Sequence, residues 1–330
     1  GDEPYYPIND ARNQALYARY AGLMAGEPGV YCCGRLAEYR YYDMDRAMEN
    51  ALAMAQRLLK DAGTQKTPCW GKEARLMTMV VMVAAHKLYW MPTDAAYWPV
   101  MVGAAGKAVP AGWYRDDAGE NISARNATFC ELTGHYWLWK NVDAEVYGLC
   151  HYRRYFSRKF PVREKRQRIL SGEQLSSSMQ GYDVLLPKKR HYWIETNYSQ
   201  YVHAHHAEAL RVTREIIAEK YADYLPAWDQ VMQRRSGHRF NMFLMRKDVF
   251  RSYSAWLFDI LFELERRLDI SDYSSNDRRV FGFVGERLLD VWLTHDRPSF
   301  CECGVVNLES QHWGKKIYHF LKRKFKGSLA

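Results

Sequence analysis

The segment LMTMVVMVAAH, residues 76–86, is a continuous apolar run with the length of one β-strand. Such a run is typical of a strand covered on both faces, as in a parallel sheet packed between helices. The downstream patterns follow the order strand, helix, strand, strand, helix, strand, helix, helix. Their ranges are 76–86, 128–141, 144–151, 182–190, 207–223, 239–247, 249–268 and 278–293. This order predicts one mixed α/β domain over about 76–310, with a mixed sheet flanked by helices.

The residues before this domain predict a small α+β appendage over 1–62. Helical spacing runs from 11 to 25, a short strand follows within GVYCCGRLAEYRYYDMD (29–45), and Asp45 can cap a second helix. The stretch GTQKTPCWGKEAR (63–75) is rich in Gly, Thr, Lys and Pro, which predicts a linker. The chain begins at Gly1 without Met, which suggests a piece excised from something longer.

The composition favours an anionic partner. The chain carries 47 Lys and Arg against 38 Asp and Glu, a formal net charge of +9, which suits a nucleic acid, an acidic membrane or a phosphorylated ligand. Residues 311–330 predict a basic amphipathic helix that can lie on an anionic membrane or, alternatively, pack on the domain. The seven cysteines lack zinc-ligand spacing, and the sequence shows no signal peptide or membrane-spanning run, so we expect reduced thiols in a cytoplasmic protein.

The sharpest local signal is GLCHYRRYF (148–156), in which a predicted strand ends directly in paired arginines. Ligands of α/β proteins commonly sit at the carboxyl ends of strands. Arg153 and Arg154 can grip a diphosphate through bidentate, charge-assisted hydrogen bonds. Alternatively, one arginine pairs with a carboxylate while the other is solvated. The local sequence leaves both interpretations open.

Three carboxylates are candidates for acid–base chemistry, and each has a structural alternative. Glu286 lies in the largely apolar FGFVGERLLDVW, where a buried carboxylate costs free energy unless it is paired or used. Arg279 or Arg287 is its possible structural partner. Glu131 fits a Thr-x-x-Glu capping box before an apolar helix, and Asp117 lies in a polar loop that can be plain surface.

Cofactor and metal motifs are weak. GAAGKA (103–108) lacks the spacer and the Ser or Thr of a phosphate-binding loop, and the sequence has no GxGxxG fingerprint, so this chain alone is not expected to bind NAD or FAD. In YVHAHH (201–206) the three histidines supply a cramped set for a metal. That spacing favours a helix start or loop with one functional imidazole.

The N-terminal stretch GDEPYYPIND…NQALYARY…GRLAEYRYYDMDRAMENAL resembles, over about residues 1–58, the C-terminal end of bacterial UDP-galactopyranose mutase, the flavoenzyme that makes UDP-galactofuranose. In that family the arginine of the Gly-Arg-Leu motif and nearby tyrosines contact the substrate diphosphate, and an Asp-Met-Asp loop lies near the flavin. The resemblance maps these roles to Arg35, Tyr41, Tyr5 or Tyr6, and residues 43–45. The flavin-binding portion is missing, so neither mutase activity nor bound FAD is expected.

The rest of the chain resembles a bacterial capsule and O-antigen family, long described as a domain of unknown function and now assigned as galactofuranosyltransferases. Matching pieces span about 77–295 and include CELTGHYWLWKN, YGLCHYRRYF, LLPKKRHYWIET, MQRRSGHRFNMFLM and RVFGFVGERLLDVWL. The loop GWYRDDAGEN departs from the pattern, which leaves acceptor specificity open. The resemblance implies a GT-A-like fold that uses UDP-galactofuranose.

The resemblance also implies residue roles. By order of elements, HYRR takes the place of the metal-holding Asp-x-Asp of many GT-A enzymes, so Arg153 and Arg154 are expected to replace the metal as counter-charge. Inversion requires a carboxylate that removes the acceptor proton; Glu286 is the first choice, with Asp117 and Glu131 behind it. The other expected donor contacts are His86, Lys87, His151 and Asn241, and the expected acceptor or sugar contacts are Glu195, His203 and His206.

These observations predict an inverting glycosyltransferase that moves galactofuranose from UDP-galactofuranose to a lipid-linked bacterial surface glycan. We expect it on the inner face of the cell membrane, in contact with anionic lipid, without nucleic acid and without a cofactor, although a divalent metal stays possible. One alternative is a transferase that uses UDP-galactopyranose or another UDP-hexose. A less favoured alternative is a basic nucleic-acid-binding protein. The acceptor, the linkage and the oligomeric state are left open.

Overall fold

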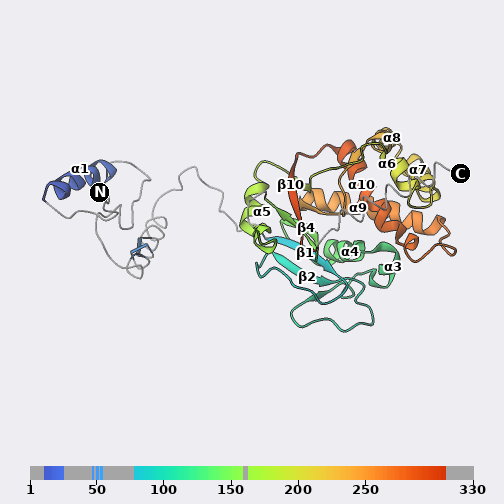
Figure 1. Cartoon of the computed structure of the whole chain (residues 1–330), viewed down its shortest axis with the longest axis horizontal. Helices are drawn as coiled ribbons and strands as arrows, with labels where there is room; N and C mark the ends of the chain where they lie inside the picture. The colour runs from blue at the N-terminus through green and yellow to red at the C-terminus, as the bar shows by residue number, and fades with distance from the viewer. Residues whose placement is uncertain are drawn as a thin grey trace. The chain divides into compact units, whose positions relative to one another are not determined.

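A computed structural model describes residues 11–25, 78–158 and 163–309, together with a few helical positions between 47 and 54. The chain divides into two compact units, Gly1–Arg75 and Leu76–Ala330. In the first unit, helix α1 spans Ala11–Ala25 (Figure 1), where the sequence predicts a helix. The predicted strand within 29–45, the linker and the basic tail lie outside the described residues.

The second unit is built on an eight-stranded mixed sheet. Strand β1 (Met79–Ala85) lies between β2 (Tyr97–Met101) and β4 (Val146–His151), and the three strands run parallel. The short β3 (Tyr114–Arg115) extends this parallel half beyond β2. The carboxyl ends of these strands therefore meet at one edge of the sheet, which we call the carboxyl edge.

Beyond β4 the sheet continues through the antiparallel β9 (Phe243–Arg246) to β6 (Val184–Pro187). Strand β10 (Phe300–Asn307) pairs in parallel with β6 and antiparallel with β5 (Arg154–Ser157). Strand β5 also pairs antiparallel with β4, through His151 and Arg154, so the order is β3-β2-β1-β4-β5-β10-β6-β9, with β9 paired to β4 as well. Because β9 runs against its neighbours, its first residues lie at the carboxyl edge.

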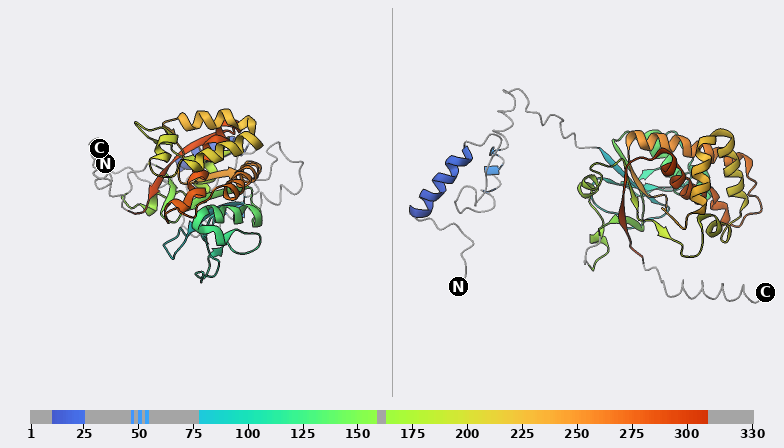
Figure 2. Two further views of the ribbon diagram at one scale, coloured as in Figure 1. Left: turned by 90° about the vertical axis from the view of Figure 1, so that its right-hand side faces the viewer. Right: turned by 90° about the horizontal axis from the view of Figure 1, so that it is seen from above.

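Helices cover both faces of this sheet. The longest, α9 (Lys247–Arg267), packs against α4, α7 and α10, which together form a helical layer on one face (Figures 1 and 2). The other helices are α3 (Asn126–Phe129), α4 (Leu132–Asn141), α5 (Gly172–Ser178), α6 (Asn197–Val202), α7 (Glu208–Lys220), α8 (Leu225–Gln233) and α10 (Val280–Asp296). The pair β7 (Arg190–His191) and β8 (Ser236–Gly237) forms a separate two-stranded sheet. The predicted mixed α/β sheet flanked by helices is confirmed.

Strand β1 explains why this sheet needs two helical covers. Its residues alternate between two hydrophobic clusters: Val80 and Met82 join the cluster of α4, α9 and α10, whereas Val81 and Val83 join the cluster of α5. The period of two in a strand sends successive side chains to opposite faces. Since both faces are buried, every position of the strand is apolar, as the sequence predicts.

Two predicted elements are shorter than expected because the backbone breaks inside them. The helix predicted over 128–141 is interrupted at Cys130, whose φ of 54° lies in the left-handed region. The strand predicted over 239–247 begins only at Phe243, because Phe240 and Asn241 have φ of 78° and 50°. No helix in the described ranges has both the length and the hydropathy of a membrane span.

Candidate active site

The site lies at the carboxyl edge of the sheet, where β1 and β4 end side by side. His86 follows β1 directly, and His151 is the last residue of β4. The turn before β9, Phe240-Asn241, reaches the same edge from the opposite direction. Open α/β sheets bind ligands at this edge because chain ends and loops converge there.

Backbone strain is concentrated at this place. Among the described residues, four non-glycine positions have positive φ, and three of them, Cys130, Phe240 and Asn241, gather around the site. Each such conformation costs about 1–3 kcal/mol and persists only where surrounding contacts enforce it. Here His151 donates from Nε2 to the carbonyl oxygen of Phe240, and the N–H of Phe240 donates to Glu286 Oε1 at 3.0 Å.

Two of the three candidate carboxylates are held by this turn. Glu286 accepts from Phe240, and Glu131 accepts from Asn241 Nδ2 at 2.7 Å. The same Asn241 nitrogen also lies 3.2 Å from the carbonyl oxygen of Gly282, in the first turn of α10. The buried side-chain oxygen of Asn241 has no hydrogen-bond partner in the part of the chain that the structure describes. The arrangement therefore places a polar amide and two carboxylates together.

Close helix packing brings these glutamates near one another. A Cβ at Gly282 would lie 3.2 Å from Cys130 Sγ, and one at Gly285 would lie 2.9 Å from Leu132 Cδ1. The two glycines are three residues apart and share one face of α10, so they let this helix approach the α3–α4 break. A larger residue at either position would require the Cys130 or Leu132 side chain to move.

Glu131 does not act as the predicted cap. It occupies the position before α4, but its side chain makes no capping hydrogen bond there. Its carboxylate instead points to Asn241, because the break at Cys130 turns this residue toward β9. The capping-box alternative for Glu131 is therefore wrong.

Arg287 is a structural partner of Glu286, but the ion pair between them is long. Arg287 Nη1 lies 3.7 Å from Glu286 Oε2, while the Arg287 guanidinium donates to the carbonyl oxygen of Phe283 and to Gln200. A pair at this distance is weak compared with a bidentate one. Among the contacts of the described residues, one carboxylate oxygen of Glu286 thus has no short hydrogen bond, as a proton acceptor requires.

Asp117 is placed differently. Both of its carboxylate oxygens bind the guanidinium of Arg115, at 2.5 and 2.6 Å, and this bond lowers the pKa of Asp117. Its neighbour Asp116 is fully buried and accepts from the backbone N–H groups of Gly103 and Ala104, so it shapes the loop after β2. The described contacts of Asp117 do not join it to Glu131 or Glu286.

The two arginines of HYRR have different surroundings. Arg153 pairs with Glu309 at 2.7 Å and also bonds the hydroxyl of Tyr152. Arg154 instead lies over the ring of Phe240 at 4.5 Å and forms no ion pair within the described part of the chain. Burial and the charge of Arg153 lower the pKa of Arg154, whereas Glu286 and Glu131 act in the opposite direction. Arg154 is therefore the arginine that faces the glutamates.

More cations surround His86. Burial lowers the pKa of His86, and the positive charges of Lys87, Arg153, Lys107 and Arg279 lower it further. His86 and Lys87 are expected at this site from the sequence. Lys107 is not, because GAAGKA does not match a phosphate-binding loop, and Arg279 is expected only as a possible partner of Glu286. The feature of the sequence that could have identified Lys107 is a lysine in a glycine-rich loop after the second strand.

The histidine segment lies beside this site. His205 stacks on Phe283 with ring centroids 4.2 Å apart, and the guanidinium of Arg279 lies 5.2 Å from the centre of the same ring. His203 bonds Glu195 at 2.8 Å, and His206 stacks on Tyr273. Within the described ranges, no three His, Cys, Asp or Glu side chains form a set that could hold a metal ion.

Cys130 is excluded as a nucleophile by its surroundings. Burial raises the pKa of its thiol to about 11, although Arg279 donates to Sγ at 3.2 Å. A thiol with this pKa is protonated at neutral pH, and the thiolate is the reactive form. The four cysteines within the described ranges are all free, as the sequence predicts for reduced thiols.

Sequence and structure similarity place the second unit in a known family. Residues 80–297 match the family described as a domain of unknown function, DUF4422, and the chain belongs to that family. The second unit is similar to the solved apo structure of WbbM, a bifunctional glycosyltransferase, with a TM-score of 0.66 and 30% sequence identity. That match covers 71% of this chain and 46% of the WbbM chain. The domain therefore has a fold shared with a glycosyltransferase.

The N-terminal residues have a different relative. Residues 1–41 match the UDP-galactopyranose mutase family. The UDP-galactopyranose mutase of Mycoplasma pneumoniae is 53% identical over 58 residues, which are 18% of this chain and 14% of that enzyme. The probable UDP-galactopyranose mutase of Klebsiella pneumoniae is 38% identical over 65 residues, 20% of this chain and 17% of the enzyme. The predicted diphosphate and flavin contacts, Arg35, Tyr41, Tyr5, Tyr6 and residues 43–45, lie outside the described residues.

The cations around His86 predict a measurable response to a bound anion. Burial and the neighbouring cations lower the pKa of His86. We expect pyrophosphate to raise it, because an anion beside Lys87, Lys107, Arg153 and Arg279 offsets the charges that disfavour the imidazolium. Imidazole resonances followed by NMR during a pH titration, assigned with His86→Gln, measure this shift. Sodium chloride at matched ionic strength serves as the control, because it screens these charges without a bound polyanion. A His86 midpoint that stays constant or falls with pyrophosphate would rule out an anion site here.

Proposed function

We propose that this protein is an inverting glycosyltransferase that moves galactofuranose from UDP-galactofuranose to a lipid-linked bacterial surface glycan. The observation that carries the proposal is the carboxyl edge, where Arg154 and the cations around His86 lie beside Glu286 and Glu131. Such a site offers counter-charge for a diphosphate and a proton acceptor for a hydroxyl. The likeness to WbbM supports the reaction class, and the mutase-like segment supports the sugar.

The donor diphosphate would lie against Arg154, with Lys87, Lys107 and Arg279 around it. Arg154 is the best placed of these groups because its guanidinium has no described carboxylate partner and is partly withdrawn from water. Charge-assisted hydrogen bonds strengthen as water is excluded. Developing charge on the leaving UDP would be stabilised by the same cations, so a divalent metal is not required by the proposal.

The transfer step assigns the proton to Glu286. As the acceptor oxygen forms its bond to the anomeric carbon, the bond from that carbon to UDP breaks and UDP keeps the electron pair. Glu286 takes the proton of the acceptor hydroxyl, through the oxygen that is not bound to Phe240 N–H. Glu131, tied to Asn241, is the second candidate, and Asp117 is disfavoured by its bond to Arg115.

The donor and the role of Arg154 can be tested together. UDP release is measured with a galactoside acceptor and each of UDP-galactofuranose, UDP-galactopyranose and UDP-glucose, with and without EDTA. We expect turnover with UDP-galactofuranose that survives EDTA. We expect Arg154→Gln to lose at least about tenfold in kcat/KM, as a lost charged hydrogen bond is worth roughly 1.5–3 kcal/mol.

Arg153→Gln is the matched control, because the Arg153 guanidinium is already engaged by Glu309 and should lose less. Faster turnover with UDP-galactopyranose would replace the proposed donor by the alternative one. Complete inhibition by EDTA would contradict the metal-free site. Salt-sensitive binding of DNA or RNA without sugar transfer would instead favour the nucleic-acid alternative.

A conservative substitution tests the base. Glu286→Gln keeps an oxygen that can accept from Phe240 N–H, so we expect the fold to survive while kcat falls about 100- to 10,000-fold. The comparison variant is Glu131→Gln, which should retain more activity. Full turnover by Glu286→Gln, with loss in Glu131→Gln, would transfer the role to Glu131.

We further propose that the protein acts peripherally on the inner face of the cell membrane. Trp193 and Ile194 are 90% and 64% exposed in the loop before α6, and Lys188 and Arg190 precede them. Exposed aromatic and aliphatic side chains next to cations suit an anionic bilayer interface. The segment that carries Lys188 leaves the carboxyl end of β6, and the loop with Trp193 and Ile194 follows the short β7; we propose that a lipid-linked acceptor approaches on this side.

Vesicle binding tests this contact. We expect the protein to sediment with vesicles containing phosphatidylglycerol but not with pure phosphatidylcholine, because both charge and apolar insertion contribute. Trp193→Ala with Ile194→Ala should weaken sedimentation several-fold, whereas Tyr182→Ala, an exposed aromatic outside this loop, should not. Unchanged sedimentation of the double variant would show that the loop is not the membrane contact.

A further inference from the structure

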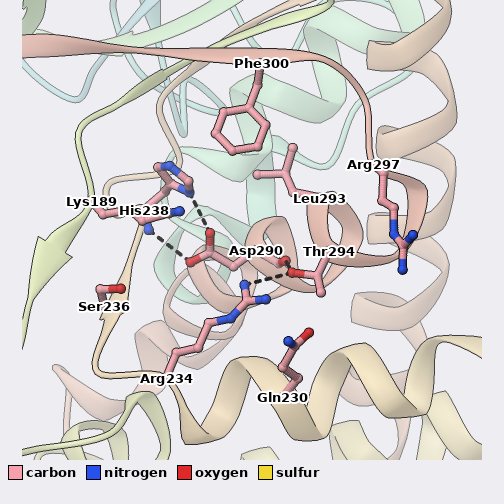
Figure 3. A pocket seen from close by; sticks show the side chains of 10 residues that line it. All are labelled: Lys189, Gln230, Arg234, Ser236, His238, Asp290, Leu293, Thr294, Arg297 and Phe300. Atoms are coloured by element: carbon pink, nitrogen blue, oxygen red, sulfur yellow. Dashed lines mark hydrogen bonds and ion pairs between the residues drawn. The ribbon is translucent and has the colours of Figure 1, made fainter.

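A second cavity lies away from the Glu286 site, between the C-terminal half of α10, the end of α8 and the start of β10. Its volume is about 520 Å³, within the range of small-molecule sites. In Figure 3, Phe300 lies on one side of it, Arg234 and Gln230 lie on the opposite side, and Lys189 and Arg297 flank it. The cavity is thus bordered by three cations and one exposed aromatic ring.

The charges of this cavity are not balanced by its own lining. Asp290 is the one acidic residue among the ten that line it. Both oxygens of Asp290 are already engaged, since Oδ1 lies 2.6 Å from His238 Nδ1 and Oδ2 accepts from the N–H of His238 at 2.9 Å. The other ring nitrogen of His238 faces Glu302 at 3.1 Å. These bonds fix the wall and hold the Asp290 carboxylate toward His238. Among the described residues it forms no ion pair with the three cations, and Lys189 lies 3.8 Å from Glu302.

The two guanidinium groups are available for an anion. Arg234 donates to Thr294 Oγ1 at 2.9 Å and, within the described residues, forms no ion pair. Arg297 likewise forms none there, and its φ of 52° puts a long cationic side chain where a helix end usually favours glycine. Guanidinium forks bind phosphate oxygens in pairs, which gives them both strength and orientation.

The remaining lining suits a sugar ring. Phe300 exposes 37% of its surface and offers an apolar face for the C–H groups of a ring. Gln230, Ser236 and Thr294 supply hydrogen-bond donors and acceptors for hydroxyl groups. The cavity thus combines an aromatic face, neutral polar groups and guanidinium groups that form no ion pair among the described residues. These features suit a phosphorylated sugar.

We propose that this cavity binds a sugar unit that carries a phosphate group. Helix α10 relates it to the Glu286 site, because Glu286, Asp290 and Thr294 follow one another at four-residue spacing on one helical face, and Arg297 follows the end of the helix. Thr294 lies eight residues after Glu286, about 12 Å along the helix axis at 1.5 Å per residue. If the proposed function holds, the natural ligand is a phosphorylated part of the acceptor; otherwise it is a free sugar phosphate.

Direct binding tests the cavity without relying on transfer. Calorimetry with galactose 1-phosphate is carried out in the Arg154→Gln background, where the anion site at the carboxyl edge is weakened. We expect binding to persist there and to fall at least about tenfold when Arg234→Gln and Arg297→Gln are added, because two charge-assisted contacts are lost. Arg211→Gln, an exposed helix arginine, is the matched control and should change nothing. Circular dichroism checks that the variants fold.

Competing probes decide the ligand. Galactose should bind more weakly than galactose 1-phosphate, and so should inorganic phosphate. Equal affinity for galactose would overturn the anion requirement, and equal affinity for inorganic phosphate would overturn the sugar requirement. Unchanged galactose 1-phosphate affinity in the Arg234→Gln and Arg297→Gln variant would overturn the site itself.

Transfer assays identify the source of the phosphate. A raised KM for a lipid-diphosphate-linked acceptor in the double variant, with a neutral galactoside unaffected, assigns it to the acceptor. If the double variant leaves the KM of both acceptors unchanged, the phosphate that binds in the cavity belongs to a free sugar phosphate. Binding in the cavity without turnover of any UDP-sugar would sink the proposed function and leave this site standing. Turnover of a UDP-sugar without binding in the cavity would overturn this site and leave the proposed function standing.

Discussion

The turn at Phe240-Asn241 holds the site together. Its left-handed conformation is unfavourable for side chains with a Cβ, and the cost is of the order of 1–2 kcal/mol per residue. Four hydrogen bonds offset that cost: one from His151, one to Glu286, one to Glu131 and one to the carbonyl oxygen of Gly282. A regular strand would direct these groups elsewhere, so the strain fixes both glutamates at the end of β4.

Charge separation at this site follows from the same turn. The turn supplies a neutral amide as the partner of Glu131 and a backbone N–H as the partner of Glu286. The nearby cations contact aromatic rings and a thiol instead. Arg154 rests on the Phe240 ring, and Arg279 lies against Phe283 and Cys130. Had the arginines and glutamates paired fully, an entering diphosphate would have to break buried ion pairs, at several kcal/mol each. The aromatic rings keep the cations in place without neutralising them.

Much of the fold could be predicted from local sequence, because period and apolarity report burial directly. The run at 76–86 predicts β1, and the apolar pattern at 249–268 matches α9 within two residues. The capping-box pattern predicted the wrong contact for Glu131, because the side chain that donates to Glu131 is that of Asn241, 110 residues away in the sequence. Similarly, no local pattern could choose between Arg153 and Arg154. The choice depends on Glu309, 156 residues beyond Arg153, and on the turn beneath Arg154.

Helix α10 gives these separate contacts a common geometry. Its first turns carry Gly282 and Gly285, which allow the approach to Cys130 and Leu132, and the next residue is Glu286. Four residues later, Asp290 fixes His238, which lies two residues before Phe240 on the segment that forms the turn. Because α10 is a rigid helix, Asp290 and Glu286 keep fixed positions relative to each other. A side chain displaced at Asp290 would therefore move His238 and Phe240 relative to Glu286. The carboxyl-edge site and the second cavity are therefore built on the same two segments, and the distance between them is set by the rise of one helix.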